Sequence, residues 1–501
     1  MAISDKTTRL LLLGLVVVAS LSLIYVTARR TLAAYAAASI APGVAVTSGC
    51  EEESLFALWR VAHNQPVYGD TTVMPYSSAY FNWLFYQGYG AIAKITSKSM
   101  SDAAIPSVSR LVTLVGALTG ATMLGLLGWR LLRPTGWEAG LAGAFLGAFC
   151  FLGPLPGWWI CTVRPDIWAV TLEALGLVWF LFLQRDRPVL ALLGSGVIFY
   201  GAWALKPNFI QGLLATILYL FAQRRWLQGF ALGVGSALVY VLTLGLLGPT
   251  YRQSLLEAMT ASNFFLSLAE SNTLSAALRA LPLGVLCVYA VFTPHSPSTA
   301  LASDLTRLAL IGLPLAFAMA FLTSAKSGAA PNYFLTTTLL LTLGGLGLAA
   351  NRPNPWPLIL SVGLAAGLEL ALLFGQGRID LQDESSALAQ RWQLWVSAPE
   401  PRFSHDLRLN LPWLNPHSPP LVLAFNYPRD RALHRKFEAD GVGGLISQGY
   451  FASLLLPSET TENYDGARLE HYQRGPSAAG YTLYLRPSAS SNSSGPRTPL
   501  P

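Results

Sequence analysis

Long apolar segments recur along this chain, and they constrain its fold more than any other feature. Hydrophobic residues make up 52% of the 501 residues, and charged residues only 12%. A membrane-spanning helix needs about 20 consecutive, mostly apolar residues. The expected spans are 10–27, 111–132, 139–160, 167–184, 189–205, 208–223, 227–248, 277–293, 305–324, 332–350 and 357–375. The sequence therefore predicts an all-α polytopic membrane protein with about 11 transmembrane helices.

Basic residues in the short loops indicate the orientation. Lys6 and Arg9 precede the first span, and further basic residues fall on the same side in later loops. They are Arg130, Arg133, Arg185, Arg187, Arg224, Arg225 and Arg352. Because cytoplasmic loops are enriched in Lys and Arg, we expect a cytoplasmic N-terminus and an extracytoplasmic C-terminal region. The short loops favour a bacterial inner membrane, and the scattered positive charge does not favour nucleic acid as a partner.

A second set of polar residues lies at the opposite ends of the spans, on the predicted outer side. They are Glu51, Glu52, Glu53, Asp70, Arg164, Asp166, Lys206, Lys326, Asn332 and Tyr333. Acids and cations from at least four loops would then converge at one end of the bundle. We interpret this as an outward-facing catalytic or binding site, although loops carry polar residues in any membrane protein.

The run of three glutamates, Glu51 to Glu53, opens an amphipathic stretch in the long outer loop, residues 28–110. Apolar residues recur at helical spacing over 54–62, which predicts a helix lying on the membrane surface. Carboxylates at a helix N-terminus are favoured by the helix dipole, so the run also has an ordinary capping explanation.

Several short motifs on this side are similar to those of a known family. The chain carries Glu52-Glu53-Ser54, Val67-Tyr68-Gly69-Asp70, Arg164-Pro165-Asp166, and Lys326-Ser327-Gly328-Ala329-Ala330-Pro331-Asn332-Tyr333-Phe334. Across residues 10–375 it resembles polytopic glycosyltransferases of the C superfamily (GT-C). Within that superfamily it is most similar to the mannosyltransferase-like and arabinosyltransferase-like branches, whose donors are polyprenyl-phosphate sugars. Glutamate replaces the commoner aspartate at the start of the acidic pair, so the base assignment stays open among Glu51, Glu52 and Glu53.

The resemblance implies an inverting hexosyl- or pentosyltransferase. It would move a sugar from a polyprenyl-phosphate donor in the bilayer to a hydroxyl of a glycan, lipid or protein acceptor on the outer face. Such a reaction needs a carboxylate to take the hydroxyl proton, and cations to stabilise the departing phosphate. Glu52 is the first choice for the base, followed by Glu53.

The remaining site residues are assigned to substrate binding. Arg164, Lys206 and Lys326 suit a phosphate, but each could instead snorkel at a helix end. Asn332 and Tyr333 suit a sugar hydroxyl or a helix cap, and the acids Asp70 and Asp166 complete the set.

The composition changes after residue 375. We expect a transmembrane module over 1–375, a small extracytoplasmic α/β domain over 376–486 with strands near 421–425, 450–456 and 481–485, and a disordered tail over 487–501. The histidines of this region have no metal-binding spacing. We therefore predict no resident metal, and leave open whether a divalent cation assists the reaction.

Two other functional classes remain as alternatives. One is a transporter or flippase of a lipid-linked sugar, but the chain shows no internal repeat, and its polar residues favour one face over the midplane. The other is a polysaccharide polymerase or ligase, which uses similar lipid donors.

Overall fold

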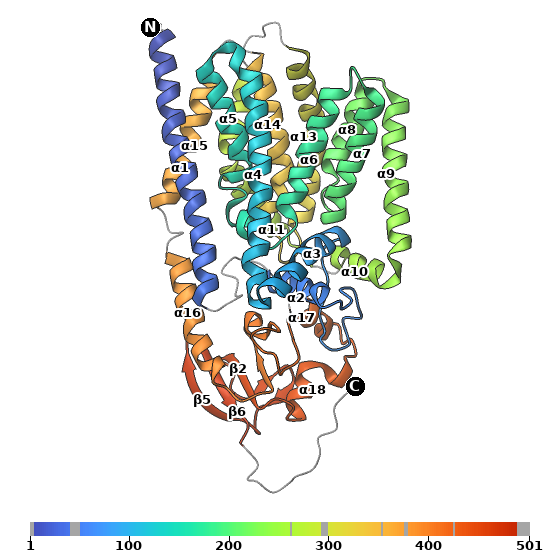
Figure 1. Cartoon of the computed structure of the whole chain (residues 1–501), viewed down its shortest axis with the longest axis vertical. Helices are drawn as coiled ribbons and strands as arrows, with labels where there is room; N and C mark the ends of the chain where they lie inside the picture. The colour runs from blue at the N-terminus through green and yellow to red at the C-terminus, as the bar shows by residue number, and fades with distance from the viewer. Residues whose placement is uncertain are drawn as a thin grey trace.

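The chain folds into a helical bundle with a small mixed domain at one end (Figure 1). The computed structural model describes residues 5–40, 51–260, 263–291, 299–351, 354–374, 379–423 and 426–487. The N-terminal end of α1 (Asp5–Ile40) and the C-terminal domain lie at opposite ends of the bundle.

The other helices and the strands follow in chain order. The helices before residue 225 are α2 (Glu51–Ala62), α3 (Trp83–Ser99), α4 (Ile105–Leu132), α5 (Trp137–Leu152), α6 (Asp166–Leu183), α7 (Pro188–Leu205) and α8 (Gln211–Ala222). The next are α9 (Trp226–Leu246), α10 (Gly248–Thr260), α11 (Leu266–Arg279), α12 (Leu281–Val291), α13 (Ala300–Ser324), α14 (Leu335–Ala350), α15 (Trp356–Phe374), α16 (Ile379–Val396), α17 (Asn426–Ala432) and α18 (Gly441–Ser447). The strands are β1 (Arg402–Ser404), β2 (Ser453–Pro457), β3 (Asn463–Tyr464), β4 (Ala467–Arg468), β5 (Gln473–Ala478) and β6 (Tyr481–Leu485).

The polytopic helical architecture is confirmed, with a correction to individual spans. Within the described ranges, eight helices are long and apolar enough to cross a membrane. Two further apolar helices, α5 and α8, are shorter than the segments predicted at 139–160 and 208–223. The span predicted at 277–293 is not one straight helix, because α11 and α12 meet there at an angle of 73°. Pro282 at the start of α12 lacks a backbone N–H, so it cannot continue the hydrogen-bond ladder of α11.

Glycine lets α4 and α5 approach closely. A Cβ atom at Gly128 would lie 2.1 Å from the carbonyl oxygen of Gly143, and one at Gly147 would lie 2.2 Å from the carbonyl oxygen of Leu124. Any side chain at these positions would push the two backbones apart. The contact is the small-residue packing typical of membrane helices.

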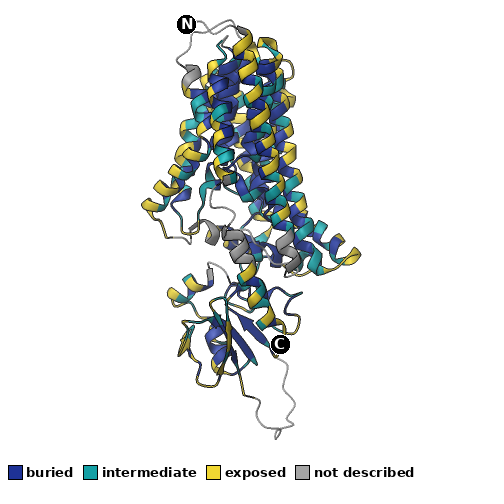
Figure 2. Cartoon of the chain, turned by 90° about the vertical axis from the view of Figure 1, so that its left-hand side faces the viewer, coloured by how far each residue is buried: buried dark blue, intermediate teal, exposed yellow. Residues whose placement is uncertain are grey.

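The outer surface of the bundle is apolar, as lipid contact requires. Helix α9 illustrates this, since only 17% of its most apolar 18-residue stretch is buried. Large side chains such as Leu227, Val234 and Leu246 are exposed. Figure 2 shows exposed residues along the outside of the bundle and buried ones between the helices. Water could not cover such a surface favourably, whereas lipid chains can.

The C-terminal domain is built on a four-stranded sheet of order β1-β2-β6-β5. Strand β1 pairs parallel with β2, and the other neighbours are antiparallel. The predicted strands at 450–456 and 481–485 correspond to β2 and β6, while β1 and β5 were not predicted.

The strand predicted at 421–425 is wrong over residues 421–423, and 424–425 lie outside the described residues. The amides of Leu421 and Val422 donate to the carbonyls of Pro419 and Pro420, so a tight turn replaces strand pairing there. The predicted disordered tail also falls almost entirely outside the described residues, which end at 487.

Two segments of the outer loop connect the bundle to this domain. The amide of Met74 donates to the Glu438 carboxylate at 2.9 Å, and the Tyr76 hydroxyl donates to the Glu438 carbonyl at 2.6 Å. One apolar core continues across the junction, since Leu55 and Leu58 of α2 belong to the same buried cluster as Trp395 of α16. Helix α2 is therefore held between the bundle and the C-terminal domain.

Candidate functional site

The first part of the candidate site is the N-terminus of α2, which Glu51 anchors to the bundle. Its carboxylate accepts two hydrogen bonds from the Arg110 guanidinium of α4, at 3.0 and 3.1 Å, and one from the amide of Val163 at 2.8 Å. The Glu51 and Arg110 side chains are 0% and 1% exposed. Glu51 therefore forms a buried ion pair with Arg110, and this pairing suits a structural role better than the role of a catalytic base.

Glu52 differs from its two neighbours in exposure. Its side chain is partly exposed, whereas those of Glu51 and Glu53 are buried. Burial raises the pKa of Glu52, and the negative charge of Glu51 adds to this rise, while the guanidinium of Arg408 opposes it. A carboxyl group with a raised pKa is a stronger proton acceptor once ionised, as a general base requires.

Arg408 comes from the C-terminal domain and is itself held in place. Its guanidinium donates twice to Asp406, both times at 2.8 Å, and Asp406 also accepts from Arg391 of α16 at 3.0 Å. Asp406 is buried, and these two guanidinium groups hold its pKa below the usual value although burial acts in the opposite direction. The domain therefore brings a fixed positive charge near α2.

The second part of the site is a buried cluster around Asp166, the first residue of α6. Its carboxylate accepts from the Lys206 ammonium at 2.5 Å and from the Asn332 amide at 2.6 Å. The Arg164 guanidinium lies 3.6 Å away. Residues from three separate loops meet here, and the two cations and one carboxylate give the cluster a formal charge of +1.

Aromatic rings line this cationic cluster. The Lys206 ammonium lies 5.0 Å from the ring centroid of Tyr333 and 5.8 Å from that of Phe81. The Arg164 guanidinium lies 5.1 Å from the Phe81 centroid and 4.7 Å from that of Trp159. Rings of this kind stabilise a cation without neutralising it, so the positive charge remains available to an anion.

The two parts adjoin each other. Val163, which hydrogen-bonds to Glu51, is the residue before Arg164. Burial raises the pKa of the Tyr86 hydroxyl in α3, the nearby charge of Glu53 adds to this rise, and that of Arg164 opposes it. The glutamates of α2 and the cluster around Asp166 therefore form one site at the end of the bundle that faces the C-terminal domain.

Two predicted site residues lie apart from these contacts. Asp70 is exposed, and its carboxylate accepts from the amide and hydroxyl of Thr72 at 2.8 and 2.7 Å, which lowers its pKa. Lys326 is half-buried, and its backbone forms an isolated bridge with Phe264. Asp70 therefore shapes the loop that reaches the C-terminal domain, and the backbone of Lys326 joins the segment before α11.

Sequence reasoning did not include Arg110, Asp406 or Arg408 among the site residues. Arg110 gave one signal, since an arginine at the start of an apolar segment either snorkels to water or pairs with a buried partner. The contribution of the C-terminal domain had no comparable signal. Among the residues that the structure describes, no group of three or more His, Cys, Asp or Glu side chains could hold a metal ion.

Comparison with solved structures identifies a similar fold. ArnT from Cupriavidus metallidurans bound to undecaprenyl phosphate matches with a TM-score of 0.55 at 13% identity, over 93% of this chain and 98% of that one. The chain has an ArnT-like fold. ArnT from the same organism in the apo state matches with a TM-score of 0.44 at 11% identity, over 92% of this chain and 97% of that one. No protein-family model matches the sequence, and a search of curated proteins finds no match.

Proposed function

We propose that this protein is a membrane glycosyltransferase that moves a sugar from a polyprenyl-phosphate donor to an acceptor hydroxyl. The acceptor oxygen attacks the anomeric carbon, and the bond from that carbon to the phosphate oxygen breaks. The phosphate leaves with the bonding electron pair as polyprenyl phosphate, and a carboxylate takes the hydroxyl proton. Direct attack of this kind inverts the anomeric configuration.

The observation that carries the proposal is the contact between an acidic helix terminus and a cationic cluster. The reaction needs a proton acceptor on one side of the anomeric carbon and positive charge near the departing phosphate. Glu52 and Glu53 supply the first, and Arg164 with Lys206 supplies the second. The net charge of +1 around Asp166 suits an anionic leaving group.

Glu52 is our assignment for the base, with Glu53 as the alternative. Glu52 is partly exposed and has a raised pKa, so an acceptor can reach it. The hydrogen bonds of Glu51 to Arg110 and Val163 favour a structural role for this residue instead. We assign Asn332 and Tyr333 to the wall of the donor site, because both contact the cationic cluster.

The neighbouring fold supports the choice of donor. The ArnT structure was solved with undecaprenyl phosphate, which is the kind of product that the proposed reaction would release. We propose that the donor enters laterally from the bilayer and that the acceptor, a glycan, lipid or protein, approaches from the side of the C-terminal domain.

The proposed orientation places the N-terminus in the cytoplasm of a bacterium and the C-terminal domain outside the inner membrane. The two lie at opposite ends of the bundle (Figure 1), and the basic loops favour the N-terminal side as cytoplasmic. Labelling of cysteines introduced at exposed positions of the C-terminal domain, with a reagent that cannot cross the membrane, tests this orientation.

The deciding experiment measures transfer from a panel of radiolabelled polyprenyl-phosphate sugars in membranes that contain the protein. The panel is run with wild type, Glu52→Gln, Glu53→Gln and the exposed control Glu462→Gln, at matched levels, with and without a chelator. We expect Glu52→Gln to abolish transfer while donor binding remains, and the control to retain activity. Undiminished transfer in both Glu52→Gln and Glu53→Gln would contradict the carboxylate mechanism. Movement of the lipid-linked sugar across the membrane without transfer would support the flippase alternative.

A further inference from the structure

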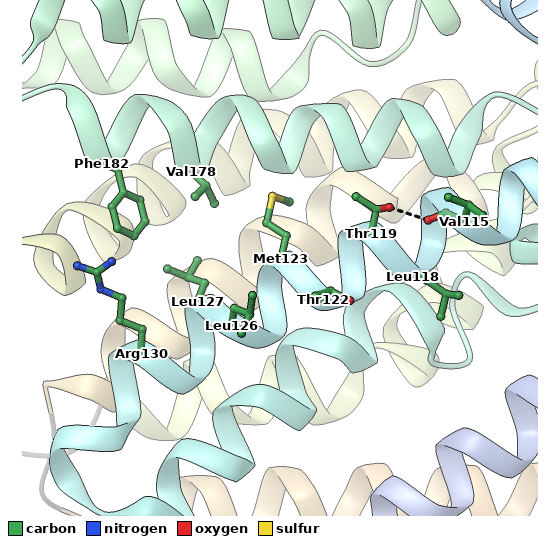
Figure 3. Close-up of a pocket in the computed structure, with 10 residues that line it drawn as sticks. All are labelled: Val115, Leu118, Thr119, Thr122, Met123, Leu126, Leu127, Arg130, Val178 and Phe182. Atoms are coloured by element: carbon green, nitrogen blue, oxygen red, sulfur yellow. Dashed lines mark hydrogen bonds between the residues drawn. The ribbon is translucent and has the colours of Figure 1, made fainter.

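A groove along the seam between α4 and α6 has no part in the proposed reaction. Its volume is about 690 Å³, and Figure 3 shows the ten side chains that line it. On α4 the lining runs from Val115 to Arg130, a length of about 22 Å at the rise of an α-helix. One leaflet of a bilayer has an apolar depth of about 15 Å, so the groove is long enough to hold one lipid chain.

The lining is suited to hydrocarbon over most of this length. Leu118, Met123 and Val178 are among the residues that present apolar side chains to the groove. The hydroxyl of Thr119 donates to the carbonyl of Val115 at 2.8 Å within its own helix, so it needs no partner in the groove. An acyl chain could therefore fill the groove without leaving this polar group unsatisfied.

The groove ends at a positive charge. The guanidinium of Arg130 lies 5.1 Å from the ring centroid of Phe182, which also lines the groove. In the described part of the chain Arg130 has no ion pair with a carboxylate and no hydrogen-bond acceptor, and its side chain is exposed. A guanidinium in this position favours an anionic group with several acceptor oxygens, such as a phosphate.

This positive end is remote from the candidate active site. Arg110, which pairs with Glu51, lies twenty residues before Arg130 on α4, or about 30 Å along the helix. Asp166, which belongs to the candidate active site, begins α6, whereas Phe182 lies at the far end of that helix. A lipid with its phosphate at Arg130 would therefore belong to the opposite leaflet from the proposed donor phosphate.

We propose that the α4–α6 groove binds an anionic glycerophospholipid of the leaflet on the N-terminal side. The phosphate of its headgroup lies at Arg130, and one acyl chain follows the groove towards Val115. The apolar lining provides chain binding, and Arg130 provides preference for a net negative headgroup. This inference does not depend on the proposed glycosyltransferase activity.

The test is native mass spectrometry of the full chain in detergent micelles, with phosphatidylglycerol and phosphatidylcholine of identical acyl chains as probes. We expect wild type to retain phosphatidylglycerol preferentially. Arg130→Gln should lose about tenfold in affinity for phosphatidylglycerol, because a hydrogen bond to a charged group is lost. The loss for phosphatidylcholine should be smaller, because its choline cation already offsets the charge of the phosphate. Thr122→Phe, which fills the groove, should weaken binding of both lipids.

Arg187→Gln is the matched control, because Arg187 is also an exposed arginine on the same side of the bundle. Thermal unfolding of each variant in detergent checks that the fold is retained. The proposal is overturned if Arg130→Gln binds phosphatidylglycerol as wild type does, or if Arg187→Gln loses as much. It is also overturned if Thr122→Phe leaves both lipids bound, or if polyprenyl phosphate displaces phosphatidylglycerol at equal concentration.

Discussion

The ion pair between Glu51 and Arg110 gives the sharpest test of how α2 is held. Both side chains are buried, with exposures of 0% and 1%. Removing one partner of a buried pair leaves an uncompensated charge and costs about 3–5 kcal/mol. Arg110→Met also removes the hydrogen bond from Arg110 to the Ala34 carbonyl, at 2.9 Å, which contributes about 1 kcal/mol. We therefore expect Arg110→Met to lower the free energy of unfolding by about 4–6 kcal/mol.

The double variant Arg110→Met with Glu51→Gln should cost much less than the sum of the two single changes. Neither charge is then left buried alone, and the glutamine oxygen still accepts from the Val163 amide. We expect a coupling energy of about 2–3 kcal/mol from the double-mutant cycle. Unfolding in mixed micelles, followed by circular dichroism as denaturing detergent increases, measures all four proteins.

The exposed control Arg187→Met should change stability by no more than about 0.5 kcal/mol. Two results would refute the reasoning. One is a cost below about 1 kcal/mol for Arg110→Met, which would mean that Glu51 finds another partner or reaches water. The other is strict additivity of the two single changes, which would mean that the charges do not interact.

Three further predictions concern the site and the packing. If Glu52 is the base, the rate of transfer rises with pH through the raised pKa of Glu52. Arg408→Gln removes a charge that lowers this pKa, so the acidic limb of the kcat/KM profile should move to higher pH. Arg408→Lys keeps the charge and should restore the profile. Lys206→Met should raise the KM for the donor about tenfold or more, because a charged contact to phosphate is lost, and an unchanged KM would remove Lys206 from the donor site. Gly128→Ala should cost about 1–3 kcal/mol, measured by thermal or detergent unfolding, because its Cβ would meet a carbonyl oxygen of α5 at 2.1 Å.

Hydropathy and loop charge were sufficient to predict the helical bundle and the end of it at which the polar residues gather. The prediction that ten outer-side residues converge holds for Arg164, Asp166, Lys206 and Asn332, which contact one another, but Asp70 lies in a separate exposed turn. It succeeded because residues that end successive spans on one side of a membrane are confined to a small area. Their catalytic and binding roles remain predictions.

Other features could not be derived in this way. Topology assigns a residue to a side but does not give its partner, so it could not distinguish Glu51, held by Arg110, from Glu52. The approach of Arg408 to Glu52 joins residues more than 350 positions apart, and no local pattern records such a contact. The bend between α11 and α12 was missed because mean hydropathy ignores the effect of Pro282 on the backbone.

The apolar core shared by α2 and α16 implies that the bundle and the C-terminal domain unfold as one cooperative unit. Leu55 of α2 and Trp395 of α16 are both fully buried within this core. A protein cut near residue 376 would leave apolar surface on both fragments, and neither would be expected to behave as an independent folding unit. Substitutions in the core shared by α2 and α16 should therefore alter the abundance of the whole protein. Measurements of activity then need to be normalised to the amount of folded chain.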